Sequence, residues 1–484
     1  MLTEENTADP AADTFLAEAA DLLGARGLTR DPDLMEPWLT DWRGRYTGRA
    51  LALASPGSTG EVAALVGLCA RHGIAIVPQG GNSGMVGGAT PDASGRSLLL
   101  SLRRMDRLRR IDPEAGQAVC EAGMILETLH ELAAANGLRF PLTLGGKGSA
   151  TVGGLISTNA GGTQVLRHGT MRAQVLGIEA VLANGDVYDG LTALRKDNRG
   201  FDLKQLLIGS EGTLGIVTAA TLRLLPAPTA RVTVWAGLPG ILEARALLRA
   251  LDRAMGGALE GFEVVPAHCL ESVLAHLPDA RAPLSQRHEW NALIEFVASD
   301  LDDAALRERA EAALGAAMAD GLFEDAAIAA NETQAEAFWT LRDSISAAER
   351  ALGPAMQHDI SVPVERMPEF ILAATRQLED EFPGTRGVAF GHLGDGNVHF
   401  HVLAPPGAAA GAWEEGEGRR VSARVHDLVT KWGGSISAEH GIGQVKLGEL
   451  ARLGDPVALS MMRAVKRALD PQGLLNPGKL VPLA

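Results

Sequence analysis

The segment from Pro78 to Gly88 constrains the fold most, because its five glycines make it too flexible for a helix or a strand. A short apolar run, residues 74–77, precedes it and predicts a strand. Before that run, Ser58 and Glu61 have the spacing of a capping box and predict a helix that ends at Gly73. A glycine loop after a strand can direct its backbone N–H groups at a phosphate; the alternative is a long surface turn.

Further glycine clusters favour a ligand over the surface turn. No position satisfies the G-x-G-x-x-G fingerprint of nicotinamide dinucleotide sites or the G-x-x-x-x-G-K-[ST] fingerprint of mononucleotide sites. Several loops that need close backbone approach therefore predict one extended ligand of another kind. The clusters are residues 145–148, 151–154, 159–162 and 208–216.

Two segments resemble the flavoproteins of the vanillyl-alcohol oxidase and p-cresol methylhydroxylase superfamily. Residues 78–84 (PQGGNSG) are similar to the loop that wraps the FAD pyrophosphate, and residues 194–216 look like the second FAD segment. The resemblance covers nearly the whole chain. It is closest to the D-2-hydroxyglutarate dehydrogenase branch, and D-lactate dehydrogenases and the glycolate oxidase flavin subunit are more distant.

This resemblance implies an α+β fold. The expected parts are a two-subdomain FAD-binding domain of the p-cresol methylhydroxylase type, a substrate (cap) domain built on an antiparallel sheet, and a C-terminal helical segment. We expect an N-terminal helical segment at residues 1–45, the FAD-binding domain at 46–227, the cap domain at 228–455, and a C-terminal segment at 456–484 that returns to the flavin. Beyond Pro226 and Pro228, strands at 231–236 and 290–297 with a helix at 242–255 predict that helices cover one face of the cap sheet.

The resemblance also implies where FAD binds and that its attachment is non-covalent. Relatives that attach the flavin covalently often have a histidine in the pyrophosphate loop, where this chain has Asn82 and Ser83. Lys479, near the C-terminus, is a further expected flavin contact. The residues expected to bind FAD are Pro78, Gly80, Gly81, Asn82, Ser83, Gly84, Met85, Pro141, Gly145, Ser149, Thr151, Gly153, Gly154, Asn159, Gly161, Gly209, Glu211, Gly212, Gly215, Ile216 and Asn476.

A histidine-rich stretch, GHLGDGNVHFH, is the second part of the sequence with evident chemistry. If Asp395 and Gly396 form a two-residue hairpin turn, His392 faces His399 across the ladder, and His401 points the same way. Facing side chains lie about 5 Å apart, close enough for two imidazoles to bind one divalent ion. The alternative is a polar hairpin whose histidines bond to water or to a carboxylate.

Glu439 and His440 add a carboxylate and another imidazole between small residues. A carboxylate with two histidines makes a three-ligand site with open positions, the form typical of catalytic metals. In the D-2-hydroxyglutarate dehydrogenase branch the matching residues bind a metal, commonly zinc, and the histidine after the glutamate is the base. The resemblance thus implies that His392, His399 and Glu439 bind a divalent metal, expected to be Zn²⁺, and that His440 is the catalytic base.

Arg342, Ser346, Gln357 and His401 are the residues expected to contact the substrate. On the helical pattern alone Arg342 is a solvated charge, whereas the resemblance makes it a carboxylate clamp, for which a guanidinium is suited. Gln357 and His401 stand where the branch usually has lysine and asparagine. Loss of the lysine charge predicts a weaker preference for dicarboxylates, although Arg342 or a protonated His401 could compensate.

The composition excludes several other classes of protein. With 44 Lys and Arg against 59 Asp and Glu, the net charge of −15 argues against a nucleic acid or an anionic membrane as partner. Three widely spaced cysteines predict neither disulfides nor a thiolate metal site. The acidic N-terminus is unlike a targeting peptide and no apolar run is long enough for a membrane span, so we expect a cytoplasmic protein. The low-complexity stretch at residues 404–418 is expected to be a solvent loop.

Together these residues suit the oxidation of a 2-hydroxy acid to the 2-oxo acid. The resemblance implies a D-2-hydroxy acid, with D-2-hydroxyglutarate ranked first and D-lactate or D-malate as alternatives. The metal would lower the pKa of the alcohol, His440 would take its proton and the flavin would take the hydride. A metal-dependent hydrolase and a non-catalytic nucleotide-binding protein are the alternative classes. Because no second redox motif is evident, we expect an external electron acceptor, and the resemblance implies an electron-transfer flavoprotein or a quinone-linked carrier. The sequence leaves open the metal, the acceptor and the oligomeric state, including a homodimer.

Overall fold

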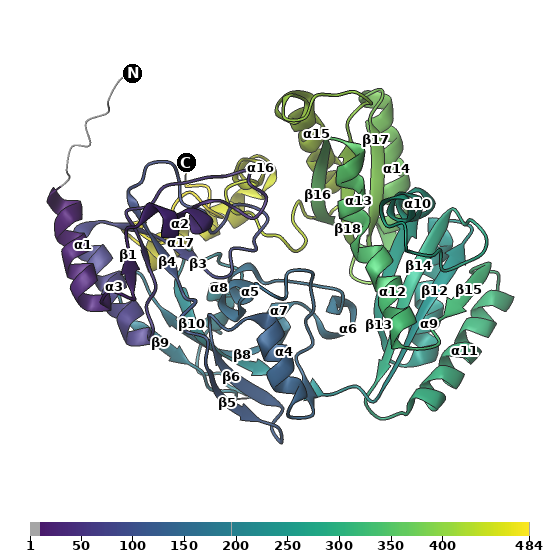
Figure 1. The fold of residues 1–484 in the computed structure, drawn as a ribbon, viewed down its shortest axis with the longest axis horizontal. Coiled ribbons are helices and arrows are strands. Elements are labelled where there is room, and N and C mark those ends of the chain that lie inside the picture. The colour runs from purple at the N-terminus through teal and green to yellow at the C-terminus, as the bar shows by residue number, and fades with distance from the viewer. Residues whose placement is uncertain (1–9, 195, 484) are drawn as a thin grey trace.

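The computed structural model describes residues 10–194 and 196–483. The chain folds into two lobes (Figure 1). The first lobe contains a four-stranded and a five-stranded sheet, and the second lobe contains a seven-stranded sheet. The first nine residues and the last residue of the predicted terminal segments lie outside the described residues.

The four-stranded sheet has the order β1-β2-β4-β3, in which β2 and β3 run parallel to β4. The predicted helix before the glycine loop is confirmed as α3 (Thr59–His72): the Ser58 side chain accepts the N–H of Glu61 (3.2 Å), and Gly73 ends the helix at φ +66°. The strands and the other helices of this part are β1 (Leu28–Thr29), β2 (Ala52–Ala54), β3 (Ala75–Gln79), β4 (Ser97–Ser101), α1 (Pro10–Leu23) and α2 (Pro32–Leu39).

The five-stranded sheet is antiparallel, with the order β5-β6-β10-β8-β9. Short helices and the two-stranded pair β7–β11 surround it. The elements are β5 (Leu108–Asp112), β6 (Gln117–Glu121), β7 (Leu138–Arg139), β8 (Val175–Val181), β9 (Val187–Gly190), β10 (Ile216–Arg223), β11 (Leu225–Pro226), α4 (Leu126–Ala134), α5 (Val152–Thr158), α6 (Val165–His168), α7 (Met171–Gln174) and α8 (Lys204–Leu207).

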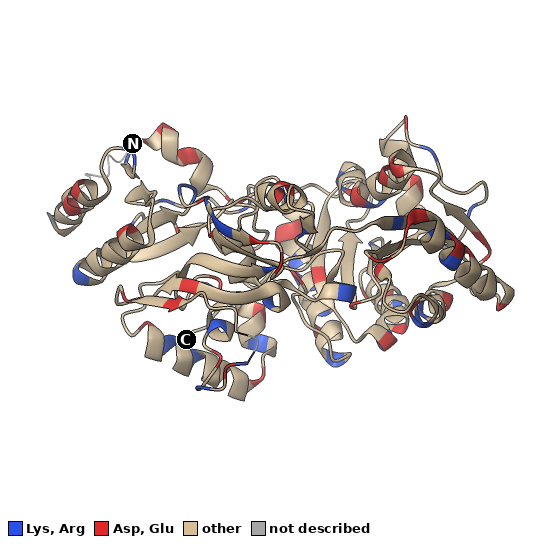
Figure 2. Ribbon diagram, turned by 90° about the horizontal axis from the view of Figure 1, so that it is seen from below, with Lys and Arg blue, Asp and Glu red and all other residues tan. Residues whose placement is uncertain are grey.

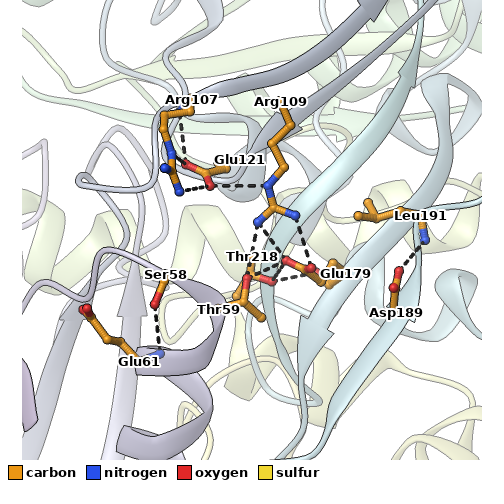
Figure 3. A network of polar contacts seen from close by, with 10 residues as sticks. All are labelled: Ser58, Thr59, Glu61, Arg107, Arg109, Glu121, Glu179, Asp189, Leu191 and Thr218. Atoms are coloured by element: carbon orange, nitrogen blue, oxygen red, sulfur yellow. Dashed lines mark hydrogen bonds and ion pairs between the residues drawn. The ribbon is translucent and has the colours of Figure 1, made fainter.

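A polar network around Arg109 joins the five-stranded sheet to the start of helix α3 (Figure 3). Arg109 contacts Glu121 on β6 (3.3 Å) and Glu179 on β8 (3.1 Å). Thr59, at the start of α3, donates its hydroxyl to Glu179 (2.6 Å). The network therefore fixes the start of α3, the helix that leads into the glycine loop, against the five-stranded sheet.

The seven-stranded sheet of the second lobe is antiparallel, with the order β15-β12-β14-β13-β17-β18-β16. Its strands are β12 (Ala230–Leu238), β13 (Leu259–Pro266), β14 (Trp290–Ala298), β15 (Asp325–Ile328), β16 (Ala355–Ser361), β17 (Arg386–His392) and β18 (Asn397–Leu403).

Helices cover both faces of this sheet, so the prediction of helices on one face is wrong. One face packs on a core that contains Val234, Leu247 and Phe370, and it is covered by α9 (Ile241–Met255), α11 (Asp303–Ala319), α14 (Met367–Glu381) and α15 (Arg419–Lys431). The other face packs on a core that contains Trp235 and Phe338, and it is covered by α10 (Ala267–His276), α12 (Glu332–Asp343) and α13 (Ile345–Leu352). Adjacent residues such as Val234 and Trp235 enter opposite cores because side chains alternate along a strand.

The low-complexity stretch at residues 404–418 is only partly a solvent loop. Trp413 is 9% exposed and packs in the larger core of the second lobe. Residues Glu414–Gly418 form a turn of π-helix that leads into α15. The solvent-loop prediction is wrong for this second half, because one large aromatic ring is enough to anchor a stretch of small residues.

The C-terminal residues return to the first lobe (Figure 1). Helix α17 (Pro456–Leu469) places Lys466 so that its Nζ donates to the carbonyl oxygens of Thr213 (2.7 Å) and Leu475 (2.8 Å). Leu475 forms a parallel bridge with Ile76.

Helix α16 (Leu447–Leu453) precedes α17. In the segment just before α16, the carbonyl oxygen of Gly443 accepts the N–H of Leu480 (3.1 Å). The division at residues 227 and 455 remains our proposal.

Charged residues of both signs are interspersed over both lobes in Figure 2. This distribution agrees with the net charge of −15 and with the absence of a basic block in the sequence. Among the described residues, no helix has the length and apolar character needed to cross a membrane.

Glu260 on β13 connects the two lobes. Its carboxylate, which is 2% exposed, contacts Arg139 (2.5 Å) and Arg167 (3.0 Å) of the first lobe. His168 and Gln164 also bond to it, at 3.2 and 3.0 Å. Burial opposes ionisation of this group, but these partners hold the pKa of Glu260 well below its usual range.

We predict that Glu260→Gln destabilises the protein by about 3 kcal/mol, because it leaves two partly buried guanidinium groups without a counter-charge. Thermal unfolding of the purified protein should show a midpoint several degrees lower. Glu311→Gln is the matched control: Glu311 pairs with Arg307 on the exposed side of α11, and such pairs contribute about 0–1 kcal/mol. Equal midpoints for the two variants would contradict the role of Glu260.

Candidate active site

The strands β16, β17 and β18 present the predicted histidines on one face of the seven-stranded sheet. His392 pairs with Asn397, and Phe390 pairs with His399. On its other side His399 pairs with Asp359. Side chains directly across a ladder point the same way, so these rows share one face. We call it the reaction face, and its residues are Phe390, His392, Asn397, His399, His401, Gln357 and Asp359.

The predicted two-residue hairpin turn is wrong. The turn spans residues 393–396, with the N–H of Gly396 donating to the carbonyl oxygen of His392 (3.1 Å), so His399 lies diagonally from His392 rather than opposite. The register differs from the predicted one by two residues, and because side chains alternate with a period of two, both imidazoles stay on the same face. Their ring centroids are 5.6 Å apart, so the two rings are still neighbours.

Glu439 reaches the reaction face from the segment before α16 and completes a three-residue cluster. Single ligand atoms of His392, His399 and Glu439 lie within 4.8 Å of one another. The Oε1 atom of Glu439 is buried without a hydrogen-bond partner among the described residues, and burial raises the pKa of this carboxyl to about 7. A buried carboxylate oxygen that lacks a donor and faces two imidazoles suits a divalent cation.

Glu263 orients His392, a role that the sequence analysis did not foresee. The Nδ1 atom of His392 lies 2.5 Å from Oε1 of Glu263, so Nε2, which lies 3.3 Å from Nη2 of Arg342, is the ring nitrogen that could bind a metal. Burial disfavours the imidazolium, but Glu263 outweighs it and raises the pKa of His392 to about 9. The one available signal was the presence of two glutamates, Glu260 and Glu263, among the apolar residues of strand β13.

Arg342 is not the solvated charge that its helical pattern suggests. Its side chain is 12% exposed, and its Nε donates to Oε2 of Glu263 (2.8 Å). The guanidinium lies 5.8 Å from the ring centre of Phe390, and Nη2 lies 3.3 Å from Nε2 of His392. Arg342 therefore borders the metal cluster. Ser346, in the first turn of α13, is partly buried.

Asp359 holds the segment that carries Glu439 and His440. Its buried Oδ2 accepts the backbone N–H groups of both residues, each at 2.9 Å, and lies 3.6 Å from Nδ1 of His440. Burial lowers the pKa of His440 to about 4, although Asp359 opposes the shift. The imidazole is therefore neutral at pH 7, the state that a general base requires. Sequence reasoning missed Asp359, which lies two residues after Gln357 in the same strand.

Gln357 and His401 face each other across β16 and β18. The side-chain oxygen of Gln357 accepts a hydrogen bond from Nη1 of Arg43 (2.8 Å), a residue of the N-terminal segment. The Nδ1 atom of His401 contacts the buried carboxylate of Glu349 on α13. Both predicted substrate residues therefore lie on the reaction face, one row beyond His399.

The glycine loops predicted to hold FAD come together on the first lobe. A Cβ atom on Gly81 would lie 1.6 Å from the carbonyl oxygen of Ser149, and one on Gly212 would lie 2.4 Å from Cγ of Pro78. Only glycine permits such approaches. Asn82, in the middle of the first loop, has φ +51°. The loops therefore form one continuous cradle of backbone.

Two side chains tie this cradle to the C-terminal residues and to the metal cluster. Asn476 donates its amide to the carbonyl oxygen of Glu211 (2.7 Å), and the Glu211 carboxylate accepts the N–H of Gly443 (2.7 Å). A Cβ atom on Gly161 would lie 3.0 Å from Oε1 of Glu439. The flavin loops and the candidate metal cluster are thus adjacent.

The remaining residues expected to contact FAD fall into three sets. Gly153 and Gly215 pack closely against Ala122 and Leu207, and Ile216 is buried in the core of the first lobe; their contact with FAD stays a prediction. Lys479 is 4% exposed, and burial lowers its pKa. The others lie on the cradle loops or beside them and stay predictions: Gly80, Ser83, Gly84, Met85, Pro141, Gly145, Thr151, Gly154, Asn159 and Gly209.

Two family models match the chain. The model described as "FAD binding domain" matches residues 50–190. The model described as "FAD linked oxidases, C-terminal domain" matches residues 227–480. Together they include the glycine clusters between residues 78 and 162, the reaction face and the segment with Glu439 and His440, whereas the cluster at residues 208–216 lies between the two matches.

Curated relatives match almost the whole chain. D-2-hydroxyglutarate dehydrogenase, mitochondrial, from Arabidopsis thaliana is 36% identical over 462 residues, which cover 96% of this chain and 80% of the relative. D-2-hydroxyglutarate dehydrogenase from Xanthomonas citri pv. viticola is 38% identical, with 94% of each chain covered. D-2-hydroxyglutarate–pyruvate transhydrogenase from Saccharomyces cerevisiae is 32% identical, with 93% of this chain and 90% of the relative covered.

Solved structures share the fold at lower identity. p-Cresol methylhydroxylase superposes with a TM-score of 0.74 at 18% identity, covering 98% of this chain and 97% of its own. 4-Ethylphenol oxidase from Gulosibacter chungangensis superposes with a TM-score of 0.73 at 19% identity, covering 99% of both chains. The predicted α+β fold of the p-cresol methylhydroxylase type is therefore confirmed. By its family models and by relatives that are more than 30% identical over more than nine-tenths of its length, this chain belongs to the FAD-linked oxidase family and is an FAD-dependent dehydrogenase.

Proposed function

We propose that this dehydrogenase oxidises D-2-hydroxy acids to 2-oxo acids with the help of a divalent metal, and that D-2-hydroxyglutarate is its preferred substrate. The observation that carries the proposal is the meeting of His392, His399, Glu439 and His440 beside Gly161 of the flavin cradle. The names of the relatives at 32–38% identity favour the same substrate. D-lactate and D-malate are the alternative substrates. The family models leave the hydrolase alternative without support.

The residues of the chain divide the work of the reaction. His392, His399 and Glu439 would hold the metal, which when bound supplies Lewis acidity toward the carboxylate and hydroxyl oxygens of the substrate. Asp359, near Nδ1 of His440, leaves Nε2 as the atom that accepts the hydroxyl proton. Arg342, whose charge is paired with Glu263, lies beside the cluster and would donate hydrogen bonds to the substrate carboxylate.

Bound FAD supplies the acceptor for the hydride that leaves Cα as the hydroxyl proton moves to His440. The chain provides the backbone cradle and positions it beside the metal cluster. We further propose that the electrons then pass to an external carrier, an electron-transfer flavoprotein or a quinone-linked protein. The names of several relatives include the word mitochondrial and that of the Xanthomonas relative does not. A cytoplasmic location stays our prediction for this chain.

Under anaerobic conditions, D-2-hydroxyglutarate should bleach the flavin absorbance of the purified protein. D-malate and D-lactate should bleach it more slowly, as ranked above. The L-enantiomers are the control and should be poor reductants, because a fixed metal, base and flavin present one face of Cα for hydride transfer. Efficient bleaching by L-acids, or none by any D-2-hydroxy acid, would refute the proposed function.

The variants His392→Ala, His399→Ala and Glu439→Ala should each lose the bound metal and at least about 100-fold in activity while FAD remains, because other segments build the flavin cradle. His440→Gln is the contrasting variant: it should keep the metal and slow flavin reduction about 10²–10⁴-fold. Elemental analysis and stopped-flow absorbance measure the two effects. Full metal occupancy in the three ligand variants would disprove the assignment.

We predict that FAD is bound tightly but without a covalent bond, because Asn82 and Ser83 occupy the part of the loop where a histidine would attach it. Acid precipitation of the protein should leave the flavin in the supernatant, where its absorbance spectrum identifies it. Colour that stays with the pellet would contradict this prediction.

A further inference from the structure

A short turn between α2 and β2 holds Arg43 in a fixed position. The buried carboxylate of Asp41 accepts the backbone N–H groups of Arg45 (2.7 Å) and Tyr46 (2.6 Å). Gly44 supplies the positive φ of +67° that the turn requires. None of these bonds uses the side chain of Arg43. The turn therefore positions the guanidinium without occupying its N–H groups.

This turn lies between the flavin cradle and the reaction face. On one side, Asn82 of the glycine loop donates to the carbonyl oxygen of Thr40 (2.8 Å). On the other side, Nη1 of Arg43 donates to the side-chain oxygen of Gln357 (2.8 Å). Arg43 also contributes to the electrostatic environment of His440. A residue of the first lobe thus reaches into the site on the second lobe.

The charge on Arg43 lacks a counter-ion. Among the described residues, no carboxylate oxygen lies within ion-pair distance of it, and its side chain makes one hydrogen bond, to the neutral Gln357. Burial, then Arg45 and Arg350, lower the pKa of Arg43 to about 10, and Asp41 and Asp359 oppose this shift from beyond ion-pair distance, so the guanidinium stays protonated at pH 7. Arg342 differs, because Glu263 already neutralises it at 2.8 Å. A partly desolvated cation without a partner is costly, and a bound anion would remove that cost.

The spacing between neighbouring rows of residues on β16 and β18 sets the distance between the Arg43 contact and the candidate metal cluster. Gln357 pairs with His401, and Asp359 pairs with His399, so the row that contacts Arg43 is the next one beyond the row of a metal ligand. Alternate residues along a strand lie about 7 Å apart. A 2-hydroxy acid whose first carboxylate binds at the metal can span this interval only if its chain continues to a second carboxylate. Lactate, which ends at a methyl group, cannot do so.

Given the oxidation proposed above, we propose that Arg43 is a specificity-determining residue that binds the second carboxylate of a dicarboxylic D-2-hydroxy acid. Gln357 accepts one N–H group and orients the guanidinium, so the other N–H groups can contact both oxygens of a carboxylate. The positive charge then comes from the first lobe rather than from position 357. The weaker preference for dicarboxylates that the sequence suggested is therefore replaced by the expectation of a clear preference.

The test compares wild-type holoenzyme with Arg43→Met on D-2-hydroxyglutarate and on D-2-hydroxyvalerate, a monocarboxylate of equal length. We expect kcat/KM for D-2-hydroxyglutarate to fall about 30- to 100-fold, mostly through KM, because a charged hydrogen-bonded contact is lost from the bound substrate. The value for D-2-hydroxyvalerate should change less than about threefold, since that substrate never makes the contact. Arg43→Lys should retain part of the preference, because a lysine keeps the charge but loses the two-point contact.

Arg45→Met is the matched control, because Arg45 lies in the same turn with an exposed side chain, and it should leave the ratio of the two substrates unchanged. Flavin content and thermal unfolding confirm that each variant is folded. An unchanged ratio in Arg43→Met, or an equal loss for both substrates, would overturn the proposal. A binding experiment tests Arg43 even if no hydroxy acid is oxidised, because calorimetry gives the dissociation constants of glutarate and valerate directly. Only glutarate should bind more weakly to Arg43→Met than to the wild type. Equal weakening for both acids, or no weakening for either, would overturn the assignment.

Discussion

The carboxylate of Asp359 is the interaction on which the arrangement of the site depends. It is buried in β16 and accepts the backbone N–H groups of Glu439 and His440, which lie 80 and 81 residues further along the chain. These bonds bring the segment with the candidate ligand and base onto the strand that faces His399. A buried carboxylate without donors is costly, so strand and segment stabilise each other. Glu211 acts in the same way from the first lobe, where it holds Gly443 of that segment beside the flavin cradle.

Features that depend on neighbouring residues could be predicted from the sequence. The helix from Ser58 to Gly73 is set by its own capping residues, and the glycine loop is set by residues that tolerate unusual backbone angles. The β17–β18 hairpin shows that the face of a strand can be predicted correctly even when the turn is not. The turn length was wrong, yet His392 and His399 kept a common face, because an error of two residues in register preserves the alternation of side chains.

Features that depend on contacts between distant segments could not be predicted. In the sequence, Glu263 and Asp359 are charges within strands without an evident role, and their roles follow only from partners on other elements. Arg342 lies off the apolar stripe of its helix, and only the carboxylate of β13 explains why its charge is buried. Trp413 likewise packs into the core of the second lobe, although the composition of residues 404–418 favours a solvent loop. In each case one long-range pairing overrides the local pattern.

Two arginines near the reaction face, Arg342 and Arg43, differ in whether the protein supplies an ion-pair partner. We infer that this difference gives them different roles. Glu263 neutralises Arg342 and orients His392, so these three groups form a preorganised unit whose geometry needs no ligand. Such a unit suits the part of the reaction that every substrate shares. Arg43 bonds to a neutral amide and makes no direct ion pair within the described part of the chain, so a bound anion would stabilise its charge further. Because only a substrate with a second carboxylate can provide that anion, selectivity is expected to reside where the folded protein leaves a charge unpaired.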